Sequence, residues 1–381
     1  MDELELGYVL AVASAAVYSP RAVRAWLRSC GSARSLVNRI RNVAASDSTS
    51  ATDEHPPERL SAQARCKIAA IDDTAAHAAV VAAQGSGARV VLENDDEYPS
   101  GLRQLCDAPI ALYARGDLAC LSRRCVAIVG SRAASAYGRA IAGTLAAELA
   151  AYSATIVSGL ARGIDAAAHR GALDAGVPTV AVLGSGVCAL YPHYHALLAD
   201  EVVARGGAVL SEFPPAQSAR AFHFPMRNRI VAALADATVV VEAGARSGAL
   251  ITARLADEFG RHVCAIPGDV GRPTSCGTNA LIADGVPLVT SAADVAALLR
   301  WEPVIERASQ AMGDGPDAQC DDLLAALALP QTVDQLAESR RSSVAEIAAR
   351  LTILELQGVV AREPGGAYSL VRRSPAAKGP A

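Results

Sequence analysis

From Arg89 onward, short runs of β-branched residues alternate with alanine-rich stretches at helical spacing. This alternation is typical of βαβ units, which build a parallel sheet with helices on both faces. We expect six strands, at residues 126–129, 155–157, 179–183, 208–210, 238–242 and 262–266. A helix is expected at 137–150, because Ile141, Leu145 and Leu149 share one helical face. The pattern predicts an α/β fold with a Rossmann-like parallel sheet as its core, within a domain that spans residues 89–300.

Four of these strands run directly into glycine-containing turns. The turns are Gly130-Ser131-Arg132, the segment 158–163 with Gly159, Arg162 and Gly163, Gly184-Ser185-Gly186, and the segment 244–248 with Arg246, Ser247 and Gly248. In an open α/β sheet this edge binds ligands, because helix N-termini and bare backbone N–H groups point toward it. No turn matches G-x-G-x-x-G or G-x-x-x-x-G-K-[ST], so neither a dinucleotide fingerprint nor a Walker A loop is predicted. The expected ligand is an anion.

Cationic and aromatic side chains accompany the turns: Arg132, Arg162, Arg227, Arg229 and Arg246, with Phe224 and Asn228 beside two of them. A guanidinium matches phosphate oxygens and stacks on bases, and an aromatic ring next to cations suits unpaired bases. Each arginine also has a simpler interpretation, because the chain uses almost no lysine and arginine is its default cation. Core packing is the alternative for the phenylalanines at 222 and 224. The group as a whole favours a nucleic-acid site.

The flanks of the core have different patterns. Residues 1–85 predict a small helical domain, with Val23, Trp26 and Leu27 at helical spacing and a polar, flexible insertion at 44–59. Residues 302–319 have the composition of a linker, and residues 372–381 that of a disordered tail. Between them, residues 320–371 predict a winged-helix-like domain, with helices at 321–329, 332–338 and 343–356 and then a hairpin. The third helix has Val344, Ile347, Leu351 and Leu354 on its apolar side.

Bulk properties narrow the class of protein. A net charge of −4 gives no global basic signal, so a nucleic acid would have to be bound by a local patch. The nine cysteines form no C-x-x-C pair, which argues against a zinc site and a disulfide framework. The acidic N-terminus lacks the features of a signal peptide, and the uncharged stretch 175–199 contains turn residues unlike a membrane span. We expect a cytoplasmic protein that does not contact a membrane.

No catalytic constellation stands out. His169 follows Asp165 by four residues on a helix, which is more typical of a local hydrogen bond than of a catalytic pair. Glu212 and Glu242, at strand ends, are the acids that merit a test. The sequence predicts no catalytic residue, no metal site and no cofactor.

Ordered motifs identify a family. They include 112–117 (LYARGD), 127–132 (AIVGSR), 157–165 (VSGLARGID), 210–214 (LSEFP), 224–229 (FPMRNR) and 277–279 (GTN). Together they span about residues 98–285, and this series closely resembles the DNA-processing protein A family, called DprA or Smf, of bacterial transformation and recombination. Members of that family often have a sterile-alpha-motif-like N-terminal domain and a winged-helix-like C-terminal domain.

The resemblance implies a homodimer that binds single-stranded DNA without cleaving it, displaces or coexists with single-strand-binding protein, and helps to load RecA recombinase. Carried over to matching positions, the DNA pocket comprises Gly130, Ser131, Arg132, Gly159, Arg162, Gly163, Arg227, Asn228, Arg246, Ser247 and Gly248. Phe224 and Arg229 join this set from the residue patterns above.

Two alternatives stay open. The same superfamily includes phosphoribohydrolases, resembling the cytokinin-activating LOG proteins, whose Pro-Gly-Gly-x-Gly-Thr loop would fall near 243–252; here that stretch reads AGARSGALIT. In the C-terminal domain, Arg340, Arg341 and Arg350 could enter a major groove, whereas Glu346 and Glu355 oppose DNA contact, so a protein-binding role is equally open.

Overall fold

The structure is a computed structural model that describes residues 1–45, 58–304 and 331–340, and parts of 343–370. It divides into two compact units, Met1–Ile305 and Glu306–Ala381. Most of the expected insertion at 44–59 and of the linker at 302–319 lies outside the described residues. The helix expected at 321–329 and the tail at 372–381 lie wholly outside them.

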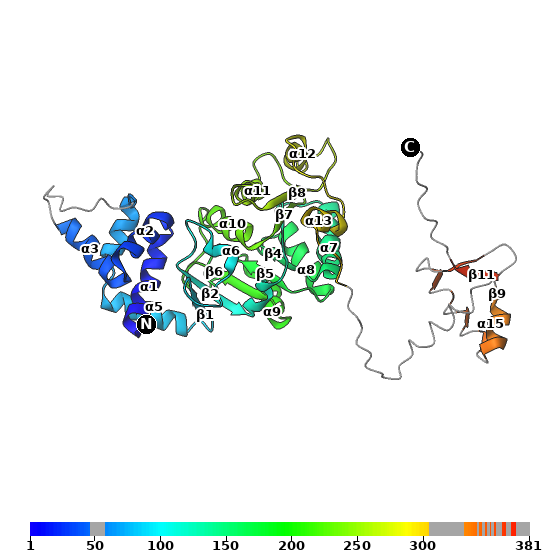
Figure 1. Ribbon diagram of the computed structural model, residues 1–381, viewed down its shortest axis with the longest axis horizontal. Coiled ribbons are helices and arrows are strands. Elements are labelled where there is room, and N and C mark those ends of the chain that lie inside the picture. The colour runs from blue at the N-terminus through cyan, green and yellow to red at the C-terminus, as the bar shows by residue number, and fades with distance from the viewer. Residues whose placement is uncertain are drawn as a thin grey trace. The chain divides into compact units, whose positions relative to one another are not determined.

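The first unit is built on an eight-stranded sheet in the order β1-β2-β6-β5-β4-β3-β7-β8 (Figure 1). Its strands are β1 (Arg89–Leu92), β2 (Ala111–Gly116), β3 (Cys125–Val129), β4 (Thr155–Ser158), β5 (Thr179–Val182), β6 (Ala208–Ser211), β7 (Ala237–Val240) and β8 (His262–Ala265). The six predicted strands are confirmed as β3 to β8, parallel and within two residues of their expected bounds. The prediction omitted β1 and β2, which add an antiparallel edge because β2 pairs antiparallel with β6.

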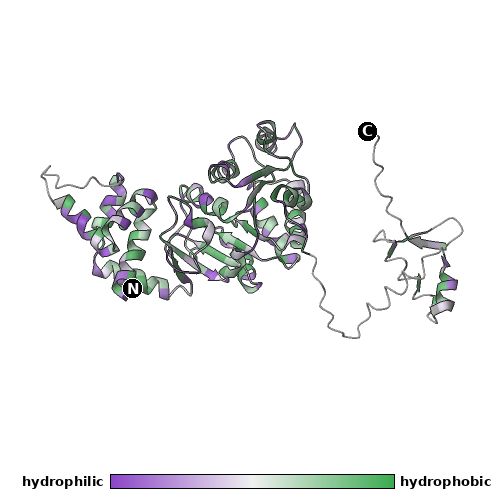
Figure 2. Ribbon diagram, viewed as in Figure 1, coloured by the Kyte–Doolittle hydropathy of each residue, from purple (hydrophilic) through white to green (hydrophobic). Residues whose placement is uncertain are grey.

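Helices cover both faces of the sheet (Figure 1). One face carries α7 (Ala136–Glu148), α8 (Ile164–Asp174), α9 (Ala196–Ala204) and α13 (Ala292–Leu299), and the other α6 (Ser100–Arg103), α10 (His223–Leu234), α11 (Gly248–Glu258) and α12 (Cys276–Ala283). Along β3, Val126 and Ile128 pack toward α7, whereas Ala127 and Val129 pack toward α10. The central strands β3 to β7 are therefore buried along their whole length and mostly apolar (Figure 2).

The N-terminal helices are α1 (Glu3–Ala16), α2 (Pro20–Cys30), α3 (Ala33–Ala45), α4 (Ala62–Ala69) and α5 (Asp73–Gln84). Pro20 occupies the first turn of α2, and Gly31 ends that helix with a φ of +74°. The helical pattern expected from Leu60 to about Ala83 is two helices, because the Asp72 carboxylate accepts a hydrogen bond from Ala75 N and starts a new one. These helices share a core with Tyr113 of β2 and Val209 of β6, so they pack directly on the sheet.

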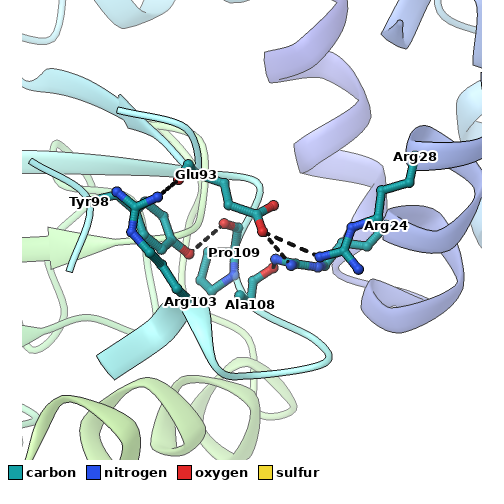
Figure 3. Close-up of polar contacts among 7 residues, drawn as sticks. All are labelled: Arg24, Arg28, Glu93, Tyr98, Arg103, Ala108 and Pro109. Carbon is teal, nitrogen blue, oxygen red and sulfur yellow. Dashed lines mark hydrogen bonds and ion pairs between the residues drawn. The ribbon is translucent and has the colours of Figure 1, made fainter. Parts of the chain in front are cut away.

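A buried arginine joins the N-terminal helices to the sheet (Figure 3). Arg24 on α2 is 3% exposed; its Nη1 donates to the carbonyl oxygen of Ala108 at 2.9 Å, and its Nη2 lies 2.5 Å from Glu93 Oε1. The segment that carries Glu93 is fixed in turn, because Arg103 donates to the Glu93 carbonyl and Tyr98 donates to that of Pro109. A charge-assisted, largely buried pair therefore sets the position of α2 against this part of the sheet.

The second unit contains β9 (Gln331–Thr332), α15 (Val333–Arg340), β10 (Val360–Arg362) and β11 (Ala367–Leu370), with the strands in the order β10-β11-β9. The predicted hairpin is confirmed, with Val360 opposite Leu370. Ile347, Leu351 and Leu354 are buried as expected, but Val344 is 51% exposed, so the apolar side of that segment is narrower than predicted. In the part of the chain that the structure describes, no helix has both the length and the apolar character needed to cross a membrane.

Candidate nucleic-acid interface

The strand order places a candidate binding crevice at the carboxyl ends of β3 and β7. The chain runs from β3 outward through β4, β5 and β6 on one side, and then returns to place β7 and β8 on the other side of β3. The strand order therefore reverses between β3 and β7, and the loops leaving these two strands diverge and open a crevice. A cavity of ≈ 650 Å³ lies there.

Ten of the thirteen predicted site residues line this cavity: Gly130, Ser131, Arg132, Gly159, Phe224, Arg227, Asn228, Arg246, Ser247 and Gly248. They come from the turns after β3, β4 and β7 and from the first turns of α10 and α11. The charged lining is three arginines against one acid, Asp165. The cavity is therefore suited to an anion.

Arg227 is the buried cation of the site. It is 4% exposed, and its Nη1 donates to the carbonyl oxygen of Gly159 at 2.6 Å and to that of Val182. Burial lowers the pKa of Arg227 to about 10, and nearby Asp165 opposes this shift, so the guanidinium stays charged at neutral pH. Its Nε has no hydrogen-bond partner among the described residues. A buried charged donor without a partner is costly unless a ligand satisfies it.

Asp165 supports the turn around Arg227. Its carboxylate accepts hydrogen bonds from Gly159 N at 3.1 Å and Ala161 N at 3.4 Å. Burial raises the pKa of Asp165, while Arg227 and the backbone donors act in the opposite direction. This carboxylate therefore shapes the glycine turn and balances the charge of the arginine.

Arg132 and Phe224 form the outer part of the site. The Arg132 guanidinium lies over the Phe224 ring, 4.6 Å from its centroid, and Arg132 itself is exposed. The Phe224 ring also contacts Tyr191, with 5.7 Å between ring centroids. Tyr191 is not among the predicted site residues, because its side chain has no charge and it lies five residues after the Gly184-Ser185-Gly186 turn in the same loop. Together these side chains present a cation and two aromatic rings.

The start of α11 supplies backbone donors. Ser247 is the N-cap residue of this helix, and its hydroxyl oxygen accepts from Ala249 N. Asn228 Nδ2 donates to the Gly248 carbonyl at 3.2 Å and so ties α10 to this turn. Arg246 is exposed next to the helix start. A helix N-terminus beside an exposed arginine favours a phosphate group.

Three predicted residues do not line the cavity. Arg229 is 5% exposed and pairs with two carboxylates, Glu212 at 2.6 Å and Asp107 at 3.2 Å. Its guanidinium neutralises those two acids and does not line the cavity. The expectation that Arg229 belongs to the site is therefore corrected. Gly163 has a φ of +85° and lies where a Cβ would be 2.2 Å from the Ser131 carbonyl oxygen, so it shapes the turn. Arg162 is exposed just before it, outside the lining.

The acids and the histidine considered for catalysis have structural partners. Both oxygens of the buried Glu242 carboxylate accept hydrogen bonds from Ser135, one from its N–H and one from its hydroxyl. Glu212 is paired with Arg229. His169 Nδ1 lies 2.7 Å from Thr179 Oγ1, and burial lowers the pKa of His169 to about 3. Within the described residues, no group of three or more His, Cys, Asp or Glu side chains could hold a metal ion.

Comparisons with known proteins match both the α/β core and the C-terminal part of the chain. The profile of DNA recombination-mediator protein A matches residues 89–300, and that of the DprA winged helix domain matches residues 307–366. Protein Smf of Escherichia coli is 41% identical over 284 residues, which cover 73% of this chain and 76% of that protein. The DNA processing protein DprA of Streptococcus pneumoniae is 46% identical over 208 residues, covering 53% of this chain and 71% of the relative.

Solved structures show the same fold. The X-ray structure of DNA processing protein A from Streptococcus pneumoniae superimposes with a TM-score of 0.62 at 33% identity, covering 79% of this chain and 99% of that one. A structure of DNA processing protein A from Helicobacter pylori, described as giving insights into its single-stranded DNA binding mode, has a TM-score of 0.51 at 30% identity and covers 57% of this chain and 99% of that one. With its α/β core and its C-terminal domain both matched, this chain belongs to the DNA recombination-mediator protein A family.

Proposed function

We propose that this protein binds single-stranded DNA without cleaving it, and that the cavity at the ends of β3, β4 and β7 holds the DNA backbone. The observation that carries the proposal is Arg227, a buried, charged residue that lines the cavity and whose Nε has no partner among the described residues. Phosphate oxygens are acceptors that match a guanidinium. The solved relative from Helicobacter pylori, whose description names single-stranded DNA binding, supports the choice of ligand.

The pairing of Arg132 with Phe224 favours single strands over duplexes. An aromatic face next to a cation can stack on a base while the cation neutralises the neighbouring phosphate. In a duplex the base faces are already stacked and are not available to a side chain. Single-stranded DNA therefore gains both contacts, whereas duplex DNA gains only the phosphate contact.

The wider role that we propose is to protect incoming or recombining single strands in the cytoplasm and to help load RecA recombinase onto them, as a homodimer and in exchange with single-strand-binding protein. Residues 1–85 and 320–371 serve in this scheme as a sterile-alpha-motif-like and a winged-helix-like domain. RecA filament formation on DNA coated with single-strand-binding protein tests this role, and a filament rate unchanged by the protein would contradict it.

A nucleotide phosphoribohydrolase is not favoured by any observation at this edge. That chemistry needs an acid free to act on the nucleotide, but both oxygens of the Glu242 carboxylate hold the N-terminus of α7 through Ser135. Incubation of the protein with AMP should release no free adenine. Release that disappears in Glu242→Gln would contradict the non-enzymatic proposal.

The proposal is tested by fluorescence anisotropy with labelled single-stranded and duplex oligonucleotides over a range of salt concentrations. We expect tighter binding to single strands and an affinity that falls steeply with salt, with Arg132→Ala weakening single-strand binding about 10-fold and reducing the salt slope by about 0.7. Arg254→Ala is the matched control, because Arg254 is exposed on α11 and does not line the cavity. Salt-independent affinity, or an equal loss in both variants, would overturn the proposal.

A further inference from the structure

Phe222 is an exposed aromatic residue that the cavity does not include. It lies just before α10 and is 42% exposed. Its ring contacts Tyr18 of the N-terminal helical domain, with 6.0 Å between centroids, and meets His223 edge-on at 4.6 Å. An exposed phenylalanine that meets an aromatic side chain from another part of the chain is a ready-made stacking surface.

Tyr18 is itself held firmly and lies beside a cation. Its carbonyl oxygen accepts a hydrogen bond from Ser61 Oγ at 3.0 Å, and the Lys67 ammonium lies 5.2 Å from its ring centroid. Lys67 is exposed. The buried Arg24, which pairs with Glu93, fixes α2 against the sheet only a few residues after Tyr18 (Figure 3). These contacts hold Tyr18 in a defined position next to Phe222.

This aromatic group continues the lining of the cavity. Ala221, the residue before Phe222, lines the cavity, and so does Phe224, two residues later. Phe222 is thus next to the cavity lining in the chain, and it contacts Tyr18, whose ring lies beside Lys67. The exposed Arg220 adds a cation on the same segment. Cations next to the exposed ring match an anionic polymer better than an apolar protein partner, which requires a larger apolar patch.

We propose that Phe222, Tyr18 and Lys67 form an outer station that binds a further base and phosphate of the single strand held in the cavity. Phe222 stacks on the base, Tyr18 supports the ring, and Lys67 neutralises the phosphate. This inference rests on the proposed function, since the cavity must hold the same strand. It gives the N-terminal helical domain a direct part in DNA binding and predicts a site that spans two domains.

The test compares a short oligothymidylate of about 4 nucleotides, at the lower end of single-strand site sizes, with a long one of about 20 nucleotides that also reaches the outer station. Anisotropy titrations use the full-length protein, Phe222→Leu, which keeps an apolar side chain but removes the ring, and Lys67→Ala. Val81→Ala is the control, because Val81 is 52% exposed on the same helical domain and is not part of the outer station. Circular dichroism melts verify that each variant is folded.

We expect Phe222→Leu and Lys67→Ala to weaken binding of the long oligonucleotide about 5-fold and to leave the short one unchanged. For Lys67→Ala the salt slope with the long oligonucleotide should also fall by about 0.7. Unchanged affinity for the long oligonucleotide, or an equal loss for both lengths, would overturn the outer station alone. Failure of the wild-type protein to bind the short oligonucleotide would instead remove the basis of the proposed function and of this inference together.

Discussion

Arg227 occupies the space that a side chain at position 159 would need. Its guanidinium donates to the Gly159 carbonyl oxygen at 2.6 Å, and a Cβ built on Gly159 would lie 2.5 Å from both terminal nitrogens of the guanidinium. The glycine is required here because the arginine approaches closely, since Gly159 does not have a positive φ. The turn after β4 and the side chain from α10 are thus fitted to each other.

Replacing that glycine should therefore disturb the arginine. Gly159→Ala displaces the buried guanidinium, and we expect the free energy of unfolding to fall by about 1–3 kcal/mol, measured by urea denaturation. Gly248→Ala is the matched control in the same cavity, since a Cβ there has nothing within 4 Å. The control should stay within about 1 kcal/mol of wild type. Equal unfolding midpoints for the two variants would refute the fitted arrangement.

Arg227 and Arg132, two of the three cavity arginines, should separate effects on stability from effects on binding. Arg227→Met leaves the buried Asp165 carboxylate without its cationic neighbour and two carbonyl oxygens without their donor, so we expect a loss of about 3–5 kcal/mol in stability. Arg132→Ala removes an exposed side chain and should cost about 0.5 kcal/mol or less. Urea denaturation measures both. A fully stable Arg227→Met would show that the buried charge does not hold this edge together.

The contact of Arg132 with Phe224 should appear as energetic coupling in DNA binding. Phe224→Leu removes the stacking surface and should weaken single-strand affinity by about 1–3 kcal/mol. The double variant with Arg132→Ala should lose less than the sum of the single losses, because the guanidinium depends on the ring for its position. Anisotropy titrations of the four proteins form the cycle. Strictly additive losses would mean that the two side chains act on DNA independently.

His169 should make the fold sensitive to acid. Burial lowers its pKa from 6.5 to about 3, so the folded protein binds fewer protons at this site than the unfolded chain does between those values. Stability should therefore decline as the pH falls below about 6.5, by up to about 1.4 kcal/mol per pH unit from this group. His169→Gln keeps a donor for Thr179 but cannot titrate.

Urea midpoints at about pH 7 and about pH 5 measure this effect. The decline between them should be smaller for His169→Gln than for wild type, whereas His262→Gln, at an exposed position, should behave as wild type does. An identical decline in all three proteins would exclude His169 as the source.

The junction between α2 and the sheet offers a further test. Glu93→Gln leaves the buried Arg24 guanidinium without a charged partner, and we expect a loss of about 1–3 kcal/mol, limited by the partial exposure of Glu93. Glu97→Gln breaks an exposed pair with Arg89 and should cost about 0–1 kcal/mol. Hydrogen exchange of α2 and urea denaturation measure the difference. Equal protection of α2 in both variants would contradict the role given to Arg24.

The parallel strands could be predicted because each is a short apolar run, and four of the six run directly into a glycine-containing turn. Strands β1 and β2 could not be predicted in the same way. They pair antiparallel, so they do not follow the strand-turn-helix pattern of the parallel strands. The positions of the strand ends also predicted which turns lie together at one edge of the sheet. They could not show that Tyr191, farther along the loop that contains Gly184, would contact Phe224 there.

The sequence could not predict which of Arg227 and Arg229 faces the cavity. Both stand in the same motif, but two positions on a helix are about 200° apart, so they face opposite ways. Arg227 reaches the glycine turn after β4, and Arg229 reaches Glu212 and Asp107. Deciding which one faces the crevice requires knowing how α10 packs on the sheet, which depends on tertiary contacts alone.

The hydrogen bond from Arg227 to Gly159 joins residues that are 68 positions apart in the chain. During synthesis, the glycine turns after β3 and β4 emerge well before the helix that carries this arginine. A nascent chain that ends ahead of α10 has the turns but neither the buried cation nor Phe224. If the cavity binds DNA as proposed, it can do so only after α10 has been synthesised.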